Sequence, residues 1–164
     1  MTEAEKILET ARMTMESAQF CSLITLDASG QPQSRIMEPF APEADFTIWM
    51  GTHRATRKVS EISADGRVTL AYYDPKDVGY VTVIAQARLV DDLALRRRYW
   101  KSQWDEFYPG GAEGDRFILI ECVPQRIEVM NYRLGVGAHP TAFKPAAAQR
   151  VGDSWQVDET LGVE

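Results

Sequence analysis

Strand-like segments, joined mostly by turns, constrain the fold of this 164-residue chain more than any other feature. No strand–helix–strand alternation runs along the chain, so a parallel Rossmann-type sheet is disfavoured. Antiparallel-looking strands with few helices instead favour a mainly β fold, a small β-barrel with peripheral helices. The predicted strands span residues 20–26, 31–40, 46–50, 67–73, 79–90, 117–123 and 126–131, with a last one at 149–157.

A helix is predicted for the N-terminal segment 1–19. Thr2 can cap this helix, and Glu5, three residues later, completes a capping box. Apolar residues at helical spacing, from Ile7 to Met15, then form a single stripe. The stripe gives the helix one apolar face.

Residues 91–107 show the clearest helical pattern in the sequence. Asp91 or Asp92 can cap the helix, and its apolar face runs from Leu95 through Trp104 to Phe107. The basic side chains within it are interpreted as a solvated face. These are Arg96, Arg97, Arg98 and Lys101.

Composition and charge disfavour several functional classes. The net charge of −6 argues against a general nucleic-acid binder, because phosphate backbones reward clustered positive charge. No apolar run approaches the length of a membrane span, so no membrane partner is expected. Residues 1–15 are charged and lack the apolar core of a signal peptide, which makes the cytoplasm the expected location. The length predicts a single domain over residues 1–164.

The two cysteines are expected to be buried thiols rather than parts of a disulfide framework. Cys21 and Cys122 each lie within an apolar strand-like run, where a thiol behaves as a small hydrophobic group. The chain has two histidines, His53 and His139, and neither stands at a metal-ligand spacing. No metal site is therefore predicted.

Residues 51–58 form the most informative motif, since they join a predicted strand to a short helical pattern at 59–63. The hydroxyl of Thr52 comes first, and Arg57 with Lys58 follows at the expected first helical turn. A helix N-terminus offers free backbone N–H groups, and the two cations add charge-assisted contacts. The motif therefore suits a phosphate, although a solvated basic helix start is the equally open alternative.

The order of several short motifs resembles one known family. These are residues 34–37 on the second strand, Thr52 followed by Arg57 and Lys58, the strand 80–89, and Trp100 and Trp104 with residues 107–111. Over roughly residues 18–131 they resemble the pyridoxamine 5'-phosphate oxidase-like, FMN-binding split barrels. The Trp-containing segment is similar to that of the branch called general stress proteins.

The resemblance implies an FMN site. Arg35, followed by Ile36 and Met37, would contact the flavin phosphate and lay backbone along the isoalloxazine ring, while Thr52 and the Arg-Lys pair would hold the phosphate. An ion pair on the strand surface, for example with Glu38 or Asp45, is the alternative role for Arg35. The full set of expected cofactor contacts is Arg35, Ile36, Met37, Gly51, Thr52, Arg57 and Lys58. FAD, heme and deazaflavin remain open as other cofactors.

The resemblance also implies a homodimer with the cofactor at the subunit interface. One split-barrel domain would then comprise the N-terminal helix 1–19, the barrel, and a C-terminal extension, 132–164. Aromatic residues that such an interface could cover, unless they belong to the core, are Trp49, Tyr72, Tyr73, Trp100 and Trp104.

Catalytic side chains are not apparent in the sequence. It has no Gly-x-Ser-x-Gly elbow, no Cys–His nucleophile pair in context, and no paired carboxylates that indicate acid–base work. In a flavoprotein the cofactor carries the redox chemistry, so this absence is compatible with an enzyme. Three functions remain open: an FMN-dependent oxidoreductase of unknown small-molecule substrate with a stress-related role, a non-catalytic flavin-binding or storage protein, and a flavin-free barrel acting through protein contacts.

Overall fold

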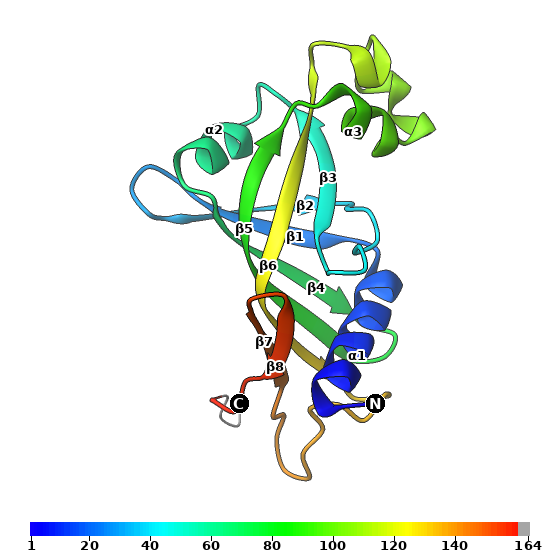
Figure 1. The fold of residues 1–164 in the computed structure, drawn as a ribbon, viewed down its shortest axis with the longest axis vertical. Helices are drawn as coiled ribbons and strands as arrows, with labels where there is room; N and C mark the ends of the chain where they lie inside the picture. The colour runs from blue at the N-terminus through cyan, green and yellow to red at the C-terminus, as the bar shows by residue number, and fades with distance from the viewer. Residues whose placement is uncertain (161–164) are drawn as a thin grey trace.

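One antiparallel sheet of eight strands organises the part of the chain that the structure, a computed structural model, describes, residues 1–160 (Figure 1). Neighbouring strands follow the order β2-β1-β4-β5-β6-β7-β8, and β3 pairs with β6 outside this path. The mainly β prediction is therefore confirmed. The strands are β1 (Cys21–Leu26), β2 (Pro32–Met37), β3 (Ile48–His53), β4 (Arg67–Asp74), β5 (Gly79–Val90), β6 (Phe117–Asn131), β7 (Ala146–Val151) and β8 (Ser154–Val157).

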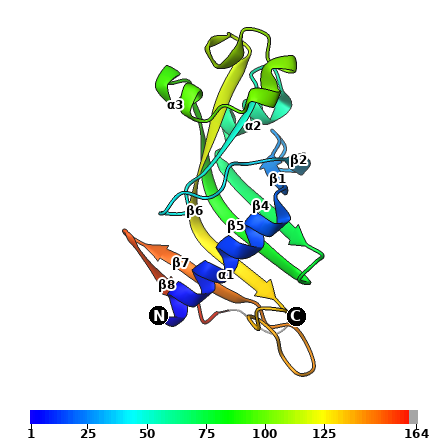
Figure 2. The same ribbon diagram turned by 90° about the vertical axis from the view of Figure 1, so that its right-hand side faces the viewer.

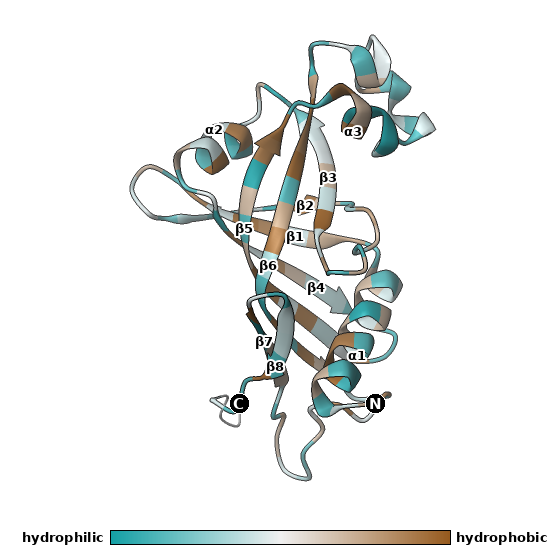
Figure 3. Ribbon diagram, in the orientation of Figure 1, coloured by the Kyte–Doolittle hydropathy of each residue, from teal (hydrophilic) through white to brown (hydrophobic). Residues whose placement is uncertain are grey.

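The long strand β6 gives the sheet its two halves. Along one edge it pairs with β5, and along the other it pairs first with β3 and then with β7. Figure 1 shows the consequence, with β3 beside one half of β6 and the β7–β8 hairpin beside the other. Polar and apolar bands alternate along β5 and β6 (Figure 3), as expected for strands with one face toward the core.

The prediction of two strands at 117–123 and 126–131 is wrong, because both belong to β6. The register against β5 shifts between Ile84, which faces Arg126, and Ala85, which faces Pro124. Such a bulge leaves one residue unpaired, and a proline, which has no N–H to donate, is tolerated there. The strand therefore continues through Pro124.

The N-terminal helix is confirmed as α1 (Glu3–Ala18), which lies across the sheet (Figure 2). The capping box also forms, since the Thr2 hydroxyl accepts from the Glu5 N–H and the Glu5 carboxylate accepts from the Thr2 N–H. The buried positions Ile7 and Met15 lie on the face that packs against the larger cluster of buried apolar side chains, here called the main core, to which strands β1, β3, β4, β5 and β6 contribute. The stripe seen in the sequence thus docks the helix.

The single helix expected at 91–107 is wrong. The segment contains α3 (Leu93–Arg98) and a 3₁₀ turn, η1 (Ser102–Glu106), which a second turn, η2 (Gly111–Glu113), follows. Tyr99 stacks on Trp49 with ring centroids 4.7 Å apart, while Trp100 meets Phe117 edge-on at 5.0 Å. Tyr99 accordingly leaves helical backbone geometry, with φ −100° and ψ 55°. These tertiary contacts override the local helical pattern.

The basic run in this segment is only partly a solvated face. Arg97 and Arg98 are exposed as expected, but Arg96 is buried. The Arg96 guanidinium donates to an Asp91 carboxylate oxygen at 2.9 Å and to the carbonyl of Gly114. It is buried because it joins α3 to the chain that follows η2. Asp92, not Asp91, caps the helix by accepting from the Leu95 N–H.

The last predicted strand, 149–157, is instead the β7–β8 hairpin, which turns at Gly152 with a φ of 62°. The loop that precedes it and the end of the chain account for the rest of the extension expected at 132–164, of which residues 161–164 lie outside the described part.

Both cysteines are buried, as predicted. Burial raises the pKa of the Cys21 thiol to about 12 and that of Cys122 further still, so both stay protonated. Within residues 1–160, no cluster of three His, Cys, Asp or Glu side chains is placed to hold a metal ion. The helices described here are all too short or too polar to cross a membrane.

A buried hydrogen bond joins the N-terminal helix to the end of β6. The Asn131 amide donates to the Thr14 hydroxyl at 2.9 Å, and both residues are almost fully buried. We expect Thr14→Val to reduce the free energy of unfolding by about 1–3 kcal/mol, because the amide loses its acceptor without reaching water. Urea denaturation measures this change. Thr14→Ser retains the hydroxyl and is the control; an equal loss in both variants would assign the effect to packing.

Candidate functional site

An open depression of about 310 Å³ lies where β2 and β3 end and α2 (Arg57–Ala64) begins. This volume is at the lower end of the range for small-molecule sites. Five of the seven predicted cofactor contacts line the depression, together with five other residues. Its lining comprises Ile36, Met37, Glu38, Gly51, Thr52, His53, Thr56, Lys58, Trp104 and Tyr108.

The polar end of the depression is formed by Thr52 and Lys58. The Lys58 ammonium donates to the Thr52 hydroxyl at 3.0 Å, and the Thr52 side chain is buried. Burial lowers the pKa of Lys58 from its ordinary value, and the nearby charge of Arg35 lowers it further, whereas Glu61 raises it. An anion beside this ammonium would relieve the cost of its charge.

The first turn of α2 supplies further groups suited to an anion. The helix begins at Arg57, two residues before the helical pattern in the sequence, and no side chain caps it. The Thr56 hydroxyl donates back to the His53 carbonyl at 2.9 Å instead. Arg57 is exposed and forms no ion pair within the described residues. The uncapped N–H groups therefore lie beside Lys58, whereas Arg57, like Arg35, is not among the residues that line the depression.

Arg35 does not line the depression. Its guanidinium forms an ion pair with Glu61 of α2 at 2.9 Å and donates to the Thr25 hydroxyl at 2.5 Å. It also donates to the carbonyls of Leu23 and Gln33. Arg35 thus forms an ion pair, but its partner is Glu61 and not Glu38 or Asp45, and only 17% of its side chain is exposed.

The two residues after Arg35 differ in burial, since one side chain faces the solvent and the other faces the core. Ile36 is 72% exposed, an unusual position for a large apolar side chain, whereas Met37 is half-buried and packs against the main core. Strand β2 ends at Met37, earlier than the predicted end at residue 40, and the chain leaves the sheet through Pro39. The backbone at the end of β2 therefore forms one edge of the depression.

Gly51 is required by aromatic packing. A Cβ at this position would lie 2.3 Å from a Phe117 ring carbon and 2.7 Å from a Trp104 ring carbon. Both rings are held by the same aromatic cluster, in which Trp104 and Phe117 are 5.6 Å apart. The glycine thus lets the Trp104 ring close over β3 and form a wall of the depression.

Five lining residues were not predicted from the sequence as site residues. Trp104 and Tyr108 belong to the aromatic segment after α3, which was expected to mark the family and, for Trp104, to supply a helix face or a subunit interface. The His53 ring lies 6.5 Å from that of Tyr108, and its Nδ1 accepts from the Ala55 N–H. His53 and Thr56 lie within the motif at 51–58, and this position is the signal that could have identified them. Glu38, which immediately follows β2, has no such signal.

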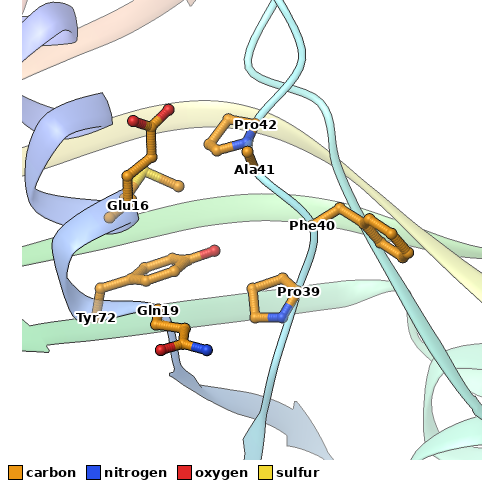
Figure 4. A pocket seen from close by; sticks show the side chains of 8 residues that line it. Glu16, Gln19, Pro39, Phe40, Ala41, Pro42 and Tyr72 are labelled. Atoms are coloured by element: carbon orange, nitrogen blue, oxygen red, sulfur yellow. The ribbon is translucent and has the colours of Figure 1, made fainter. Parts of the chain in front are cut away.

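A second cavity, of about 150 Å³, lies between the end of α1 and the chain segment at residues 39–42 (Figure 4). Figure 4 shows the Tyr72 hydroxyl pointing toward the segment around Ala41. No cationic side chain lines this cavity, so it lacks the means to hold a phosphate. Its lining is Met15, Glu16, Gln19, Pro39, Phe40, Ala41, Pro42 and Tyr72.

Comparison with known proteins identifies relatives of the chain. A family model described as "Pyridoxamine 5'-phosphate oxidase like" matches residues 5–138. General stress protein 26 of Bacillus subtilis (strain 168) is 30% identical over 113 residues, which are 67% of this chain and 78% of that protein.

Solved structures show the same fold. An FMN-binding protein from Nostoc punctiforme, related to pyridoxamine 5'-phosphate oxidase, superposes with a TM-score of 0.72 at 15% identity and covers 96% of each chain. General stress protein 26 from Bacillus anthracis has a TM-score of 0.65 at 22% identity and covers 79% of this chain and 95% of its own. The predicted split-barrel class is thereby confirmed.

We expect Gly51→Ala to disturb the aromatic wall of the depression. The added methyl group would force Trp104 or Phe117 to move, at a cost of about 1–3 kcal/mol. Tryptophan emission and near-UV circular dichroism should both change. Gly30→Ala adds the same methyl group where nothing lies within 4 Å, so it strains only the backbone. Identical spectra for wild type and Gly51→Ala would contradict the assigned packing.

Proposed function

The chain belongs to the pyridoxamine 5'-phosphate oxidase-like family, and we propose that it binds FMN and acts as an oxidoreductase on a small molecule. The observation that carries this proposal is the pairing of Lys58 with the buried Thr52 hydroxyl beside the uncapped start of α2. These groups converge from two elements on one depression. A phosphate there would receive hydroxyl, ammonium and backbone N–H donors together.

The residues present fit the phosphate of FMN. A phosphomonoester is close to a dianion at neutral pH. Lys58 lines the depression, and the exposed Arg57, next to it in the sequence, is the second cation available at the start of α2. We therefore propose that Thr52, Arg57 and Lys58 hold the phosphate. The family resemblance adds Arg35 to this set.

The remainder of the depression suits a planar, partly apolar group. Ile36, Met37 and Gly51 lie along one side of it, and Trp104 and Tyr108 contribute aromatic surface. When bound, FMN would supply the hydride or electron transfer, while these side chains orient the ring system and exclude water. The apolar edge formed by Ile36 and Met37 is proposed to lie along the isoalloxazine.

The alternatives predict different behaviour of the purified protein. A flavin-storing protein would bind FMN but would not pass electrons from NADH or NADPH through the flavin to an acceptor. A flavin-free barrel would carry no chromophore. Mass spectrometry of the molecule that copurifies distinguishes FMN from FAD, heme and deazaflavin. A general stress protein among the relatives makes a stress-related role part of the proposal. We also propose that the protein is cytoplasmic and that residues 1–164 form one domain.

We expect Arg57→Ala and Lys58→Ala each to weaken FMN binding tenfold to a hundredfold. Loss of a charge-assisted contact to phosphate costs about 1.5–3 kcal/mol. Fluorescence titration of the apoprotein with FMN measures the affinity, and riboflavin, which lacks the phosphate, should bind both variants and wild type alike. Arg67→Ala, which removes an exposed arginine paired with Asp65, is the matched control.

Two results would count against this assignment. Unchanged FMN affinity in both variants would exclude these side chains as phosphate contacts. Equal losses for FMN and riboflavin would indicate that the substitutions disturb the depression as a whole.

An apolar surface beside the site supports a homodimer. Phe20, Ile36 and Tyr73 are 44%, 72% and 69% exposed, and they lie together on the face formed by β2, β1 and β4. Exposed apolar patches of this kind mark contact surfaces. Because Ile36 also lines the depression, a partner on this face would place the cofactor at the interface. Of the five aromatic residues considered in the sequence analysis, Tyr73 is the exposed one, and Trp49 and Tyr72 belong to the core.

We expect the wild-type protein to be a dimer in light scattering and Tyr73→Asp to be a monomer with reduced affinity for FMN. A buried carboxylate at an apolar interface has no partner and opposes association. Tyr132→Asp, at a similarly exposed tyrosine outside this surface, is the control and should remain dimeric. A monomeric wild type that retains flavin at micromolar concentration would refute the interface.

A further inference from the structure

The cavity between the end of α1 and residues 39–42 is lined by a tyrosine whose hydroxyl is unsatisfied. Tyr72 is 3% exposed, and its hydroxyl has no hydrogen-bond partner within residues 1–160. Figure 4 shows this hydroxyl directed from β4 toward the segment that forms the opposite wall of the cavity. A buried hydroxyl without a partner is costly, so a group that supplies one is bound favourably there.

The Tyr72 hydroxyl stays neutral and can both accept and donate. Burial raises the pKa of this phenol well above its ordinary value, and the neighbouring thiols of Cys21 and Cys122 raise it further. A thiol is only a weak hydrogen-bonding group, so Cys21 is a poor substitute for an oxygen or nitrogen partner. The phenol oxygen is therefore available to a ligand.

The other polar side chains that line the cavity also offer oxygen acceptors. Glu16 presents an exposed carboxylate, and the Gln19 amide nitrogen already donates to Glu38 at 3.0 Å, which leaves the amide oxygen as the free end. Glu16 and Gln19 lie at the C-terminal end of α1, where backbone carbonyls carry partial negative charge, and no basic residue occupies the last turn. The cavity therefore favours a ligand that donates hydrogen bonds and carries positive charge.

The protein does not supply that positive charge itself. Among residues 1–160, no cationic side chain lines the cavity. Arg12 is one turn before Glu16 on α1, but its guanidinium donates to the carbonyls of Pro42 and Glu43. It also lies over the Phe46 ring, 4.4 Å from the ring centroid. The Glu16 carboxylate thus forms no ion pair within the described residues.

The rest of the lining is apolar and limits the size of the ligand. It comes from Met15, Pro39, Phe40, Ala41 and Pro42. A cavity of about 150 Å³ can hold a molecule of about the size of benzene. A short alkyl chain with one polar head therefore fits, with the chain against these walls.

We propose that this cavity binds a small primary ammonium ion, held between the Tyr72 hydroxyl and the Glu16 carboxylate. An ammonium group has three N–H donors and no acceptor, which matches the oxygens available there. The inference is independent of flavin binding, since no residue lines both this cavity and the depression. It is also independent of the proposed dimer surface, because Tyr72 and Tyr73 point to opposite faces of β4.

Three probes of similar shape and different charge test the class of ligand: n-butylammonium, n-butanol and butyrate. Each is titrated into the isotope-labelled protein at neutral pH and constant ionic strength, and binding is followed by NMR. The amide resonances of Met15, Ala41 and Tyr72 should shift saturably with n-butylammonium. The alcohol lacks the charge and should bind about tenfold more weakly, while butyrate, which Glu16 repels, should not bind.

Two variants each remove one proposed contact and keep the shape of the side chain. Glu16→Gln should weaken n-butylammonium binding about tenfold, and Tyr72→Phe about threefold. Both should fold, because Glu16 is exposed and the Tyr72 hydroxyl has no partner to lose, and urea denaturation checks this. Glu9→Gln removes an exposed carboxylate two turns earlier on α1 and should bind as wild type does.

Either of two results would overturn this assignment. Absence of a saturable shift with n-butylammonium in the wild-type protein would show that the cavity holds water only. Equal affinity for n-butylammonium and n-butanol, or unchanged affinity in both Glu16→Gln and Tyr72→Phe, would show that these groups do not recognise an ammonium.

Discussion

The fold depends on β6, which pairs with three other strands, whereas a strand inside a sheet normally pairs with two. Its 15 residues pair with β5 along one edge, while β3 and then β7 share the other edge. A strand with fewer residues could not hold both halves of the sheet, since each strand residue adds about 3.3 Å. The bulge opposite Ala85 lets this long strand bend between its two roles. The position of β3, and with it one side of the site, follows from this pairing.

The site forms where three chain segments meet around β3. Pairing with β6 sets Thr52 at the end of β3, and the turn that follows brings Lys58 back to its hydroxyl. The aromatic segment after α3 then closes against Phe117 above Gly51, the one position along β3 where a missing side chain makes room for a ring. A barrel strand, a helix start and an aromatic cluster are therefore interdependent, and none of them would form the depression alone.

The features predicted correctly from the sequence are those that interactions between nearby residues determine. The strand β5, the capping box of α1 and the basic helix start after Thr52 follow from periodicity and capping rules that act within a few residues. The predictions failed where contacts between residues far apart in the sequence determine the structure. Tyr99 leaves the helix because of Trp49, and the sequence could not show that Arg35 would face Glu61. Glu38 and Trp104 reach the depression only through the tertiary fold, so their place in it had no sequence signal.

The positions of three of the four tryptophans give the protein an internal optical report of its own site. Trp104 lines the depression, and the Trp100 ring meets the Trp104 ring edge-on with centroids 5.7 Å apart. Trp155 packs against Phe46 on the far half of the sheet. A coloured, planar molecule in the depression would quench the first two by energy transfer or stacking and affect the third much less. Occupancy could therefore be followed in a dilute solution of the purified protein without any attached dye.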